Sequence, residues 1–171
     1  SLLVAFLKNE VAAIGRIWLL ARSLDKQGCG WLTVDELRQH LTDKSSALRV
    51  CGWRRLRQIL SEGRGVFWER DDFGRIWLYG TIRVARHFRL THFSGDEIKL
   101  PIQELVGTVG DVRAVFYTAF HCGRKSSPIS RATLQTVTGV PERTQRHYDD
   151  VHKTERVSNF SLVADSGNQE T

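Results

Sequence analysis

Three pairs of neighbouring residues could in principle support acid–base, metal or thiol chemistry. Asp71-Asp72 and Asp149-Asp150 are adjacent aspartates. Adjacent side chains diverge on a helix and point to opposite faces of a strand. Neither pair is therefore expected to share one proton or one metal ion. His121-Cys122 lies in a helical pattern, where such neighbours are more typical of packing than of a thiolate–imidazole pair.

The sequence lacks the motifs of the common enzyme and metal-binding classes. It contains no phosphate loop, dinucleotide fingerprint, nucleophile elbow or His-Glu-x-x-His motif. Its three cysteines form no Cys-x-x-Cys pair, which favours a reducing, cytoplasmic setting over a disulfide framework or a zinc knuckle. His87 and His92 lack a suitably spaced third ligand. We expect a non-catalytic protein with no cofactor and no metal.

Arginine is the residue that distinguishes this sequence chemically. It outnumbers lysine 19 to 6, and the formal net charge is +6. Residues 1–90 carry 16 basic and 9 acidic side chains, a net charge of +7, whereas residues 91–171 carry 9 and 10, a net charge of −1. The planar guanidinium matches phosphate groups and guanine edges. Composition alone fits a nucleic-acid-binding surface and an ordinary basic surface equally well.

Apolar periodicity predicts the elements that would position these arginines. Helices follow from three- and four-residue spacing, and strands from β-branched and aromatic runs between turn residues. The expected order is a helix (9–24), a short strand (31–32), a helix (34–41) capped by Thr33, a helix (53–62) that ends at Gly63 and buries Trp53, Leu56, Ile59 and Leu60, and a hairpin of strands 66–69 and 75–79.

This order resembles a winged-helix domain over Asn9 to Gly80, with Gly52 to Glu62 as the recognition helix and Gly65 to Tyr79 as the wing. The resemblance implies that the recognition helix enters the DNA major groove and that the wing reaches the flanking backbone or minor groove. Asp71-Asp72 at the wing tip departs from this, because carboxylates repel phosphate. The expected nucleic-acid contacts in this half are Arg49, Arg54, Arg55, Arg57, Gln58, Arg64, Arg70 and Arg75.

Residues 130–151 resemble a helix-turn-helix motif hinged at Gly139, which can adopt positive φ in the turn. Ser130 is the expected N-cap. The expected inward residues are Leu134 and Val137 on the first helix and Val140, Thr144, Tyr148 and Val151 on the second. The resemblance implies base contacts from Arg143, Gln145 and Arg146, and phosphate contacts from Arg124, Lys125 and Lys153, together with Arg64 and Arg70 of the first unit.

The predicted fold is mostly α with small β-hairpin wings, in two tandem winged-helix or helix-turn-helix domains. Domain 1 covers residues 1–80 and domain 2 covers residues 111–171, where Asp111 caps the first helix. Residues 81–110 form a connector with short helices near 82–88 and 101–106. A strand near 157–163 would make the second wing incomplete.

These features favour a non-catalytic protein that binds double-stranded DNA. Tandem units of this kind are similar to plasmid or phage replication initiators and to transcription regulators. The alternative is a protein-interaction module, or a scaffold subunit of a nucleic-acid-processing complex, which suits the weakly acidic second half. The apolar segment from Leu2 to Leu7 then packs across a homodimer, against another domain, or in its own core. No uncharged run reaches the ~20 residues that span a bilayer, so no membrane partner is expected.

Overall fold

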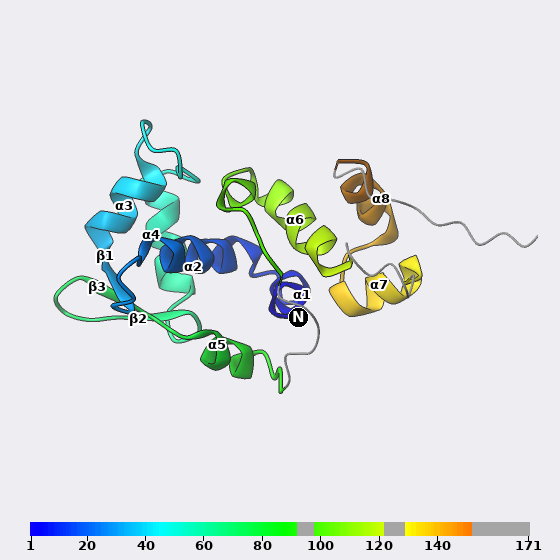
Figure 1. Cartoon of the computed structure of the whole chain (residues 1–171), viewed down its shortest axis with the longest axis horizontal. Coiled ribbons are helices and arrows are strands. Elements are labelled where there is room, and N and C mark those ends of the chain that lie inside the picture. The colour runs from blue at the N-terminus through cyan, green and yellow to red at the C-terminus, as the bar shows by residue number, and fades with distance from the viewer. Residues whose placement is uncertain (92–97, 122–128, 152–171) are drawn as a thin grey trace, which may run out of the picture.

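The computed structural model describes residues 1–91, 98–121 and 129–151 (Figure 1). This part of the chain is mostly helical, with one small antiparallel sheet. Its elements are α1 (Leu2–Lys8), α2 (Ala12–Leu24), β1 (Trp31–Thr33), α3 (Val34–Thr42), α4 (Trp53–Glu62), β2 (Trp68–Arg70), β3 (Arg75–Leu78), α5 (Thr81–His87), the 3-10 helix η1 (Ile102–Leu105), α6 (Val109–His121), α7 (Arg131–Thr138) and α8 (Glu142–Val151).

The sheet has the strand order β1-β3-β2, so the hairpin strand β3 lies in the middle. Leu32 pairs with Ile76, and Trp68 pairs with Leu78. Leu32, Ile76 and Trp68 are buried, because these alternate positions point toward the helices. The predicted short strand and hairpin are confirmed, although the hairpin strands are shorter than expected and the short strand joins them in one sheet.

Local sequence signals define the start of α3 and the end of α4. Thr33 Oγ1 accepts a hydrogen bond from the Glu36 amide at 3.1 Å, and the Glu36 carboxylate accepts one from the Thr33 amide at 2.7 Å. The predicted N-cap of α3 is therefore confirmed as a capping box. Helix α4 ends at Gly63, as expected. A Cβ atom there would lie 2.3 Å from the Trp68 ring, so the close approach of β2 requires glycine.

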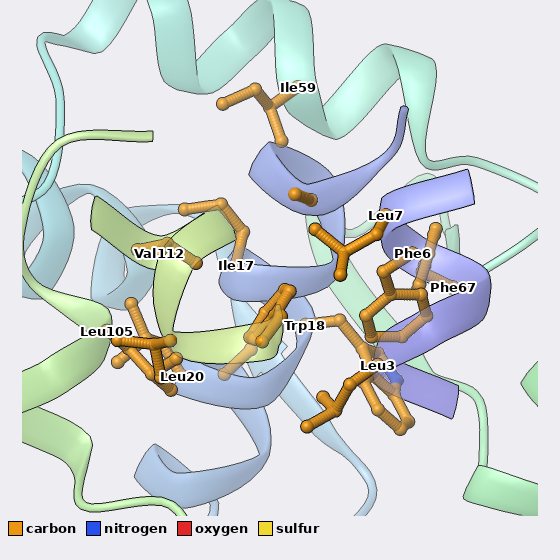
Figure 2. Close-up of a cluster of buried hydrophobic side chains, with 14 of the residues drawn as sticks. Leu3, Phe6, Leu7, Ile17, Trp18, Leu20, Ile59, Phe67, Leu105 and Val112 are labelled. Carbon is orange, nitrogen blue, oxygen red and sulfur yellow. The ribbon is translucent and has the colours of Figure 1, made fainter. Parts of the chain in front are cut away.

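The N-terminal segment folds back into the protein's own core. The predicted helix from Asn9 is wrong at its start, because Glu10 adopts a left-handed φ of 58° and separates α1 from α2. Phe6 of α1 is fully buried beside Phe67 (Figure 2), with 5.4 Å between their ring centres. The ring centre of Phe116 lies 6.0 Å from that of Phe6. Because this apolar segment is buried in the protein's own core, the prediction that it packs across a homodimer or against another domain is wrong.

One buried cluster combines side chains from both halves of the chain. Leu105 and Val112 pack with Ile17 and Leu20 (Figure 2), and α1 contacts both α6 and α7. The division at residues 80 and 110 stays a prediction, but the two halves share a core. Helix α6 begins at Val109 rather than after Asp111, because Thr108 and Asp111 form reciprocal hydrogen bonds of 3.2 and 2.7 Å at its N-terminus.

The turn between α7 and α8 matches the sequence, and the predicted inward residues Leu134, Val140 and Tyr148 are buried, but Val137 and Val151 are not. Ser130 caps α7 through a 3.1 Å bond from the Thr133 amide, and Gly139 has a φ of 72°, as predicted. However, Thr138 rather than Val137 is buried on α7. Helix α8 buries Gln145, Tyr148 and Asp149, whereas Val151 is 52% exposed. Polar side chains, those of Thr138, Gln145 and Asp149, are thus buried beside the predicted apolar ones.

None of the helices within the described residues is long and apolar enough to cross a membrane. The predicted strand near 157–163 lies outside the described residues.

Candidate nucleic-acid interface

The solvent face of α4 is a row of hydrogen-bond donors. Leu56, Ile59 and Leu60 are buried on one side of the helix. Arg54 and Arg57 are exposed on the other, as the sequence predicted, and Gln58 is exposed beside them. Arg54 makes no ion pair within the described residues. Because the helix repeats every 3.6 residues, these three side chains project from one continuous surface.

Glu62 partly neutralises the edge of this surface. Arg55 Nη1 lies 3.6 Å from Glu62 Oε1, and Gln58 Nε2 donates a hydrogen bond of 2.8 Å to the same oxygen. Both partners of the ion pair are nearly half exposed, so the pair is worth at most about 1 kcal/mol and can exchange for a phosphate. Arg55 therefore lies at the flank of the α4 surface rather than at its centre.

Trp53 is half-buried at the start of α4 and organises arginines from two helices. The guanidinium of Arg57 lies 5.6 Å from the centre of its ring, and that of Arg38 on α3 lies 5.1 Å away. Cation–π contacts of this kind restrain flexible arginines on the surface. Arg38 was missed by the sequence analysis, because only the packing of α3 on α4 brings it to this site. Arg49 is exposed just before α4, as expected.

The hairpin arginines differ in their surroundings. Arg70 is exposed, and Arg64 forms an ion pair with Glu69. Arg75 Nε donates to Asp71 at 2.7 Å. The Asp71 carboxylate also accepts hydrogen bonds from Trp77 Nε1 and from two turn amides, each at 2.9 Å. The Trp77 indole, with the Arg75 and Phe73 donors, holds the pKa of Asp71 well below its usual range.

The expected repulsion of phosphate at the hairpin tip therefore needs correction. Because Asp71 is neutralised by Arg75 and saturated by donors of its own turn, it presents little unbalanced charge. Asp72 is exposed and remains the carboxylate that would oppose a phosphate.

Helix α5 carries Arg83 and Arg86, and Arg89 follows the end of the helix; none of the three was predicted as a site residue. Arg83, Arg86 and Arg89 are all exposed, and the Arg83 guanidinium lies 3.5 Å from the centre of the Tyr79 ring. The three-residue spacing of these arginines in a helical pattern was the signal that could have revealed them. These arginines follow β3 along the chain, and Arg83 reaches back to Tyr79 at the end of the hairpin.

Gln145 is a buried structural residue, so its expected outward position is wrong. Its side chain is 0% exposed. Nε2 donates to the carbonyl oxygens of Arg131 and Val140 at 3.0 and 2.9 Å, and Oε1 accepts from the Tyr117 hydroxyl at 3.2 Å. Gln145 thus joins α8 to α7 and α6 and cannot contact a base edge.

Asp149 is also directed inward, which changes the charge balance of the second half. Arg131 Nη2 donates to it at 2.8 Å, and His121 Nε2 lies 3.7 Å away. Asp150, its neighbour, is exposed, so the predicted divergence of this aspartate pair is confirmed. Arg143 and Arg146 are exposed, as expected. Arg124, Lys125 and Lys153 lie outside the described residues, as do His92 and Cys122.

Other chemistry is sparse in the part of the chain that the structure describes. No group of three His, Cys, Asp or Glu side chains there could hold a metal ion. Burial raises the pKa of the Cys51 thiol, with Arg16, Arg55 and Arg49 acting in the opposite direction. No known protein family, curated protein or solved structure matches the chain.

Proposed function

We propose that this protein binds double-stranded DNA without catalysis, with α4 in the major groove and the β2–β3 hairpin on the flanking backbone. The observation that carries the proposal is the α4 surface, where Arg54, Arg57 and Gln58 project together opposite a fully buried stripe. Arginine pairs with guanine edges and with phosphates, and glutamine pairs with adenine. A helix of this width fits the major groove.

The sheet supports the same docking mode. In the order β1-β3-β2, strand β2 starts shortly after α4, and Gly63 permits their close packing. The hairpin loop projects beyond the helices (Figure 1), and Arg64 and Arg70 belong to this region. The arrangement is similar to that of a winged-helix domain, which we propose as the fold of the first half. Replication initiation or transcription regulation of a mobile element is the proposed biological setting.

A protein contact is the second candidate for α7 and α8. Residues 129–151 carry three basic and three acidic side chains, so this region has no net charge. Val137 and Val151 are 38% and 52% exposed. Such a neutral surface with apolar residues suits a protein partner better than DNA phosphates. We therefore propose that the first half provides most of the DNA affinity.

Fluorescence anisotropy with a labelled random-sequence duplex, repeated over a salt series, tests this function. Each neutralised phosphate contributes a slope of about −0.9 in log affinity against log salt. Replacing Arg54 and Arg57 together by Ala should weaken binding by at least about tenfold and should flatten this slope if either arginine contacts a phosphate. The matched control replaces Arg143 and Arg146 by Ala and should have a smaller effect.

Two results would refute the proposal. The first is no binding at low salt, or binding that salt does not weaken. The second is a larger loss of DNA affinity in the Arg143 and Arg146 double variant than in the Arg54 and Arg57 double variant. That result would mean that α8 rather than α4 contacts the bases.

A further inference from the structure

The outer face of the three-stranded sheet carries aromatic side chains that the core does not use. Trp31 on β1 pairs with Trp77 on β3, and their ring centres are 6.1 Å apart. The intervening residues Leu32 and Ile76 are buried, so Trp31 and Trp77 point away from the core. Trp77 is 40% exposed, and Phe73 in the hairpin turn is 83% exposed.

Arg75 unites these rings into one surface. Its guanidinium carbon lies 5.3 Å from the ring centres of Trp31, Phe73 and Trp77 alike. Asp71 accepts hydrogen bonds from both the Arg75 guanidinium and the Trp77 indole. We name Trp31, Phe73, Arg75 and Trp77 the aromatic platform. Because two members share one carboxylate, the platform is held in place before any ligand arrives.

The ligand must offer flat faces to these rings and negative charge to the arginines around them. Arg64, Arg75 and Arg83 lie near this face, through Glu69, Asp71 and Tyr79 respectively, whereas Arg70 pairs with the buried Ile76 and belongs to the opposite face. Glu69 and Asp71 are already paired with Arg64 and Arg75. Arg83, which stacks on Tyr79 and makes no ion pair within the described residues, is therefore the cation that this surface offers to a phosphate. Nucleic acid is the polyanion whose bases stack on aromatic rings and guanidinium planes.

We propose that the aromatic platform stacks unpaired bases of single-stranded nucleic acid. Bases within a duplex already stack on each other, so their faces reach a protein ring only after the strand opens. The inference extends the proposed function, since it assigns an unpaired strand to the sheet beside the duplex-binding helix α4. It predicts that the protein binds a single strand through its bases as well as its phosphates.

The test compares three probes that differ in bases and pairing. They are an oligothymidine of about 12 nucleotides, an abasic phosphodiester of the same length, and a duplex of the same length. The charge of the first two is the same, so any difference between them measures base stacking. Binding is followed by anisotropy of a terminal label and by quenching of tryptophan fluorescence. We expect oligothymidine to bind at least about tenfold more tightly than the abasic strand.

Phe73→Ala is the decisive variant, because this ring is exposed in the turn and its removal leaves the core intact. It should weaken oligothymidine binding roughly fivefold to a hundredfold and leave abasic and duplex binding within about twofold. Ile82→Ala is the matched control, since Ile82 is 62% exposed on α5 and lies outside the platform. It should change none of the three affinities.

The outcomes separate this inference from the proposed function. Equal affinity for oligothymidine and the abasic strand, or an unaffected Phe73→Ala variant, would overturn the inference while duplex binding still stands. Base-dependent binding that requires Phe73, with no affinity for the duplex, would support the platform and refute the proposed duplex mode. Failure to bind any of the three probes would refute both.

Discussion

Replacing Gln145 by Met should destabilise the protein without directly removing a DNA contact. Methionine keeps a similar length but cannot donate to the Arg131 and Val140 carbonyl oxygens, which Gln145 Nε2 reaches at 3.0 and 2.9 Å. It also removes an acceptor 3.2 Å from the Tyr117 hydroxyl. Since Gln145 is 0% exposed, water cannot take over these bonds without local opening.

The size of the effect follows from the groups left behind. A buried polar group that loses its partner costs about 1–3 kcal/mol. Two carbonyl oxygens therefore predict a loss of about 2–6 kcal/mol in the free energy of unfolding, of which the apolar methionine side chain offsets a small part. With a urea dependence of about 2 kcal/mol per molar, the unfolding midpoint should fall by roughly 1–3 M.

Urea unfolding followed by circular dichroism measures this midpoint. Gln135→Met is the matched control, because Gln135 is exposed on α7 and should change stability by less than about 0.5 kcal/mol. If Gln145 instead read a base edge, its replacement would reduce DNA affinity and leave the midpoint unchanged. That combination of results, or equal midpoints for the two variants, would refute the structural role described for Gln145.

Two further predictions concern the hairpin. Gly63→Ala should lower the free energy of unfolding by about 1–3 kcal/mol, because its Cβ would lie 2.3 Å from the Trp68 ring. The control Gly110→Ala in α6 meets only Thr108 Oγ1 at 3.6 Å and should be neutral or stabilising. Equal thermal stability of the two variants would contradict this packing. Because the pKa of Asp71 is held below its usual range, first by the Trp77 indole, its stabilising effect is complete above about pH 4 and is lost as the pH falls toward the lowered pKa. Asp71→Asn should remove this pH dependence, which the tryptophan fluorescence of the hairpin follows between pH 7 and pH 2. The same fluorescence titration for the variant and the original protein would argue against this role of Asp71.

The first half was largely predictable because its signals are local. Thr33 with Glu36, Gly63 after an apolar stripe, and a turn at Asp71 to Gly74 each specify structure within a few residues. The outward position of Arg54 and Arg57 then follows from helical periodicity. The predicted α4 surface needed no knowledge of distant contacts.

The second half was predicted less well because polar residues occupy its core. Gln145 and Thr138 are both 0% exposed, and apolar periodicity alone assigns such residues to the surface. The burial of Gln145 depends on a partner far away in sequence, the Tyr117 hydroxyl, whereas Thr138 satisfies its hydroxyl locally by donating to the Leu134 carbonyl oxygen. The aromatic platform was missed for a similar reason, since Trp31 and Trp77 meet only through the register of β1 on β3.

The shared core constrains how two DNA-contacting helices could act together. Tandem domains on a flexible linker can adjust their spacing to the DNA. Here α1 belongs to the first half of the chain but packs on α6 and α7, and Phe6 contacts both Phe67 and Phe116. Reorienting one half would expose these rings, at about 25 cal/mol for each Å² of apolar surface. The distance between α8 and the α4 surface is therefore fixed by the fold. Because residues 129–151 carry no net charge, we expect a duplex, if the proposed function holds, to meet α4 first.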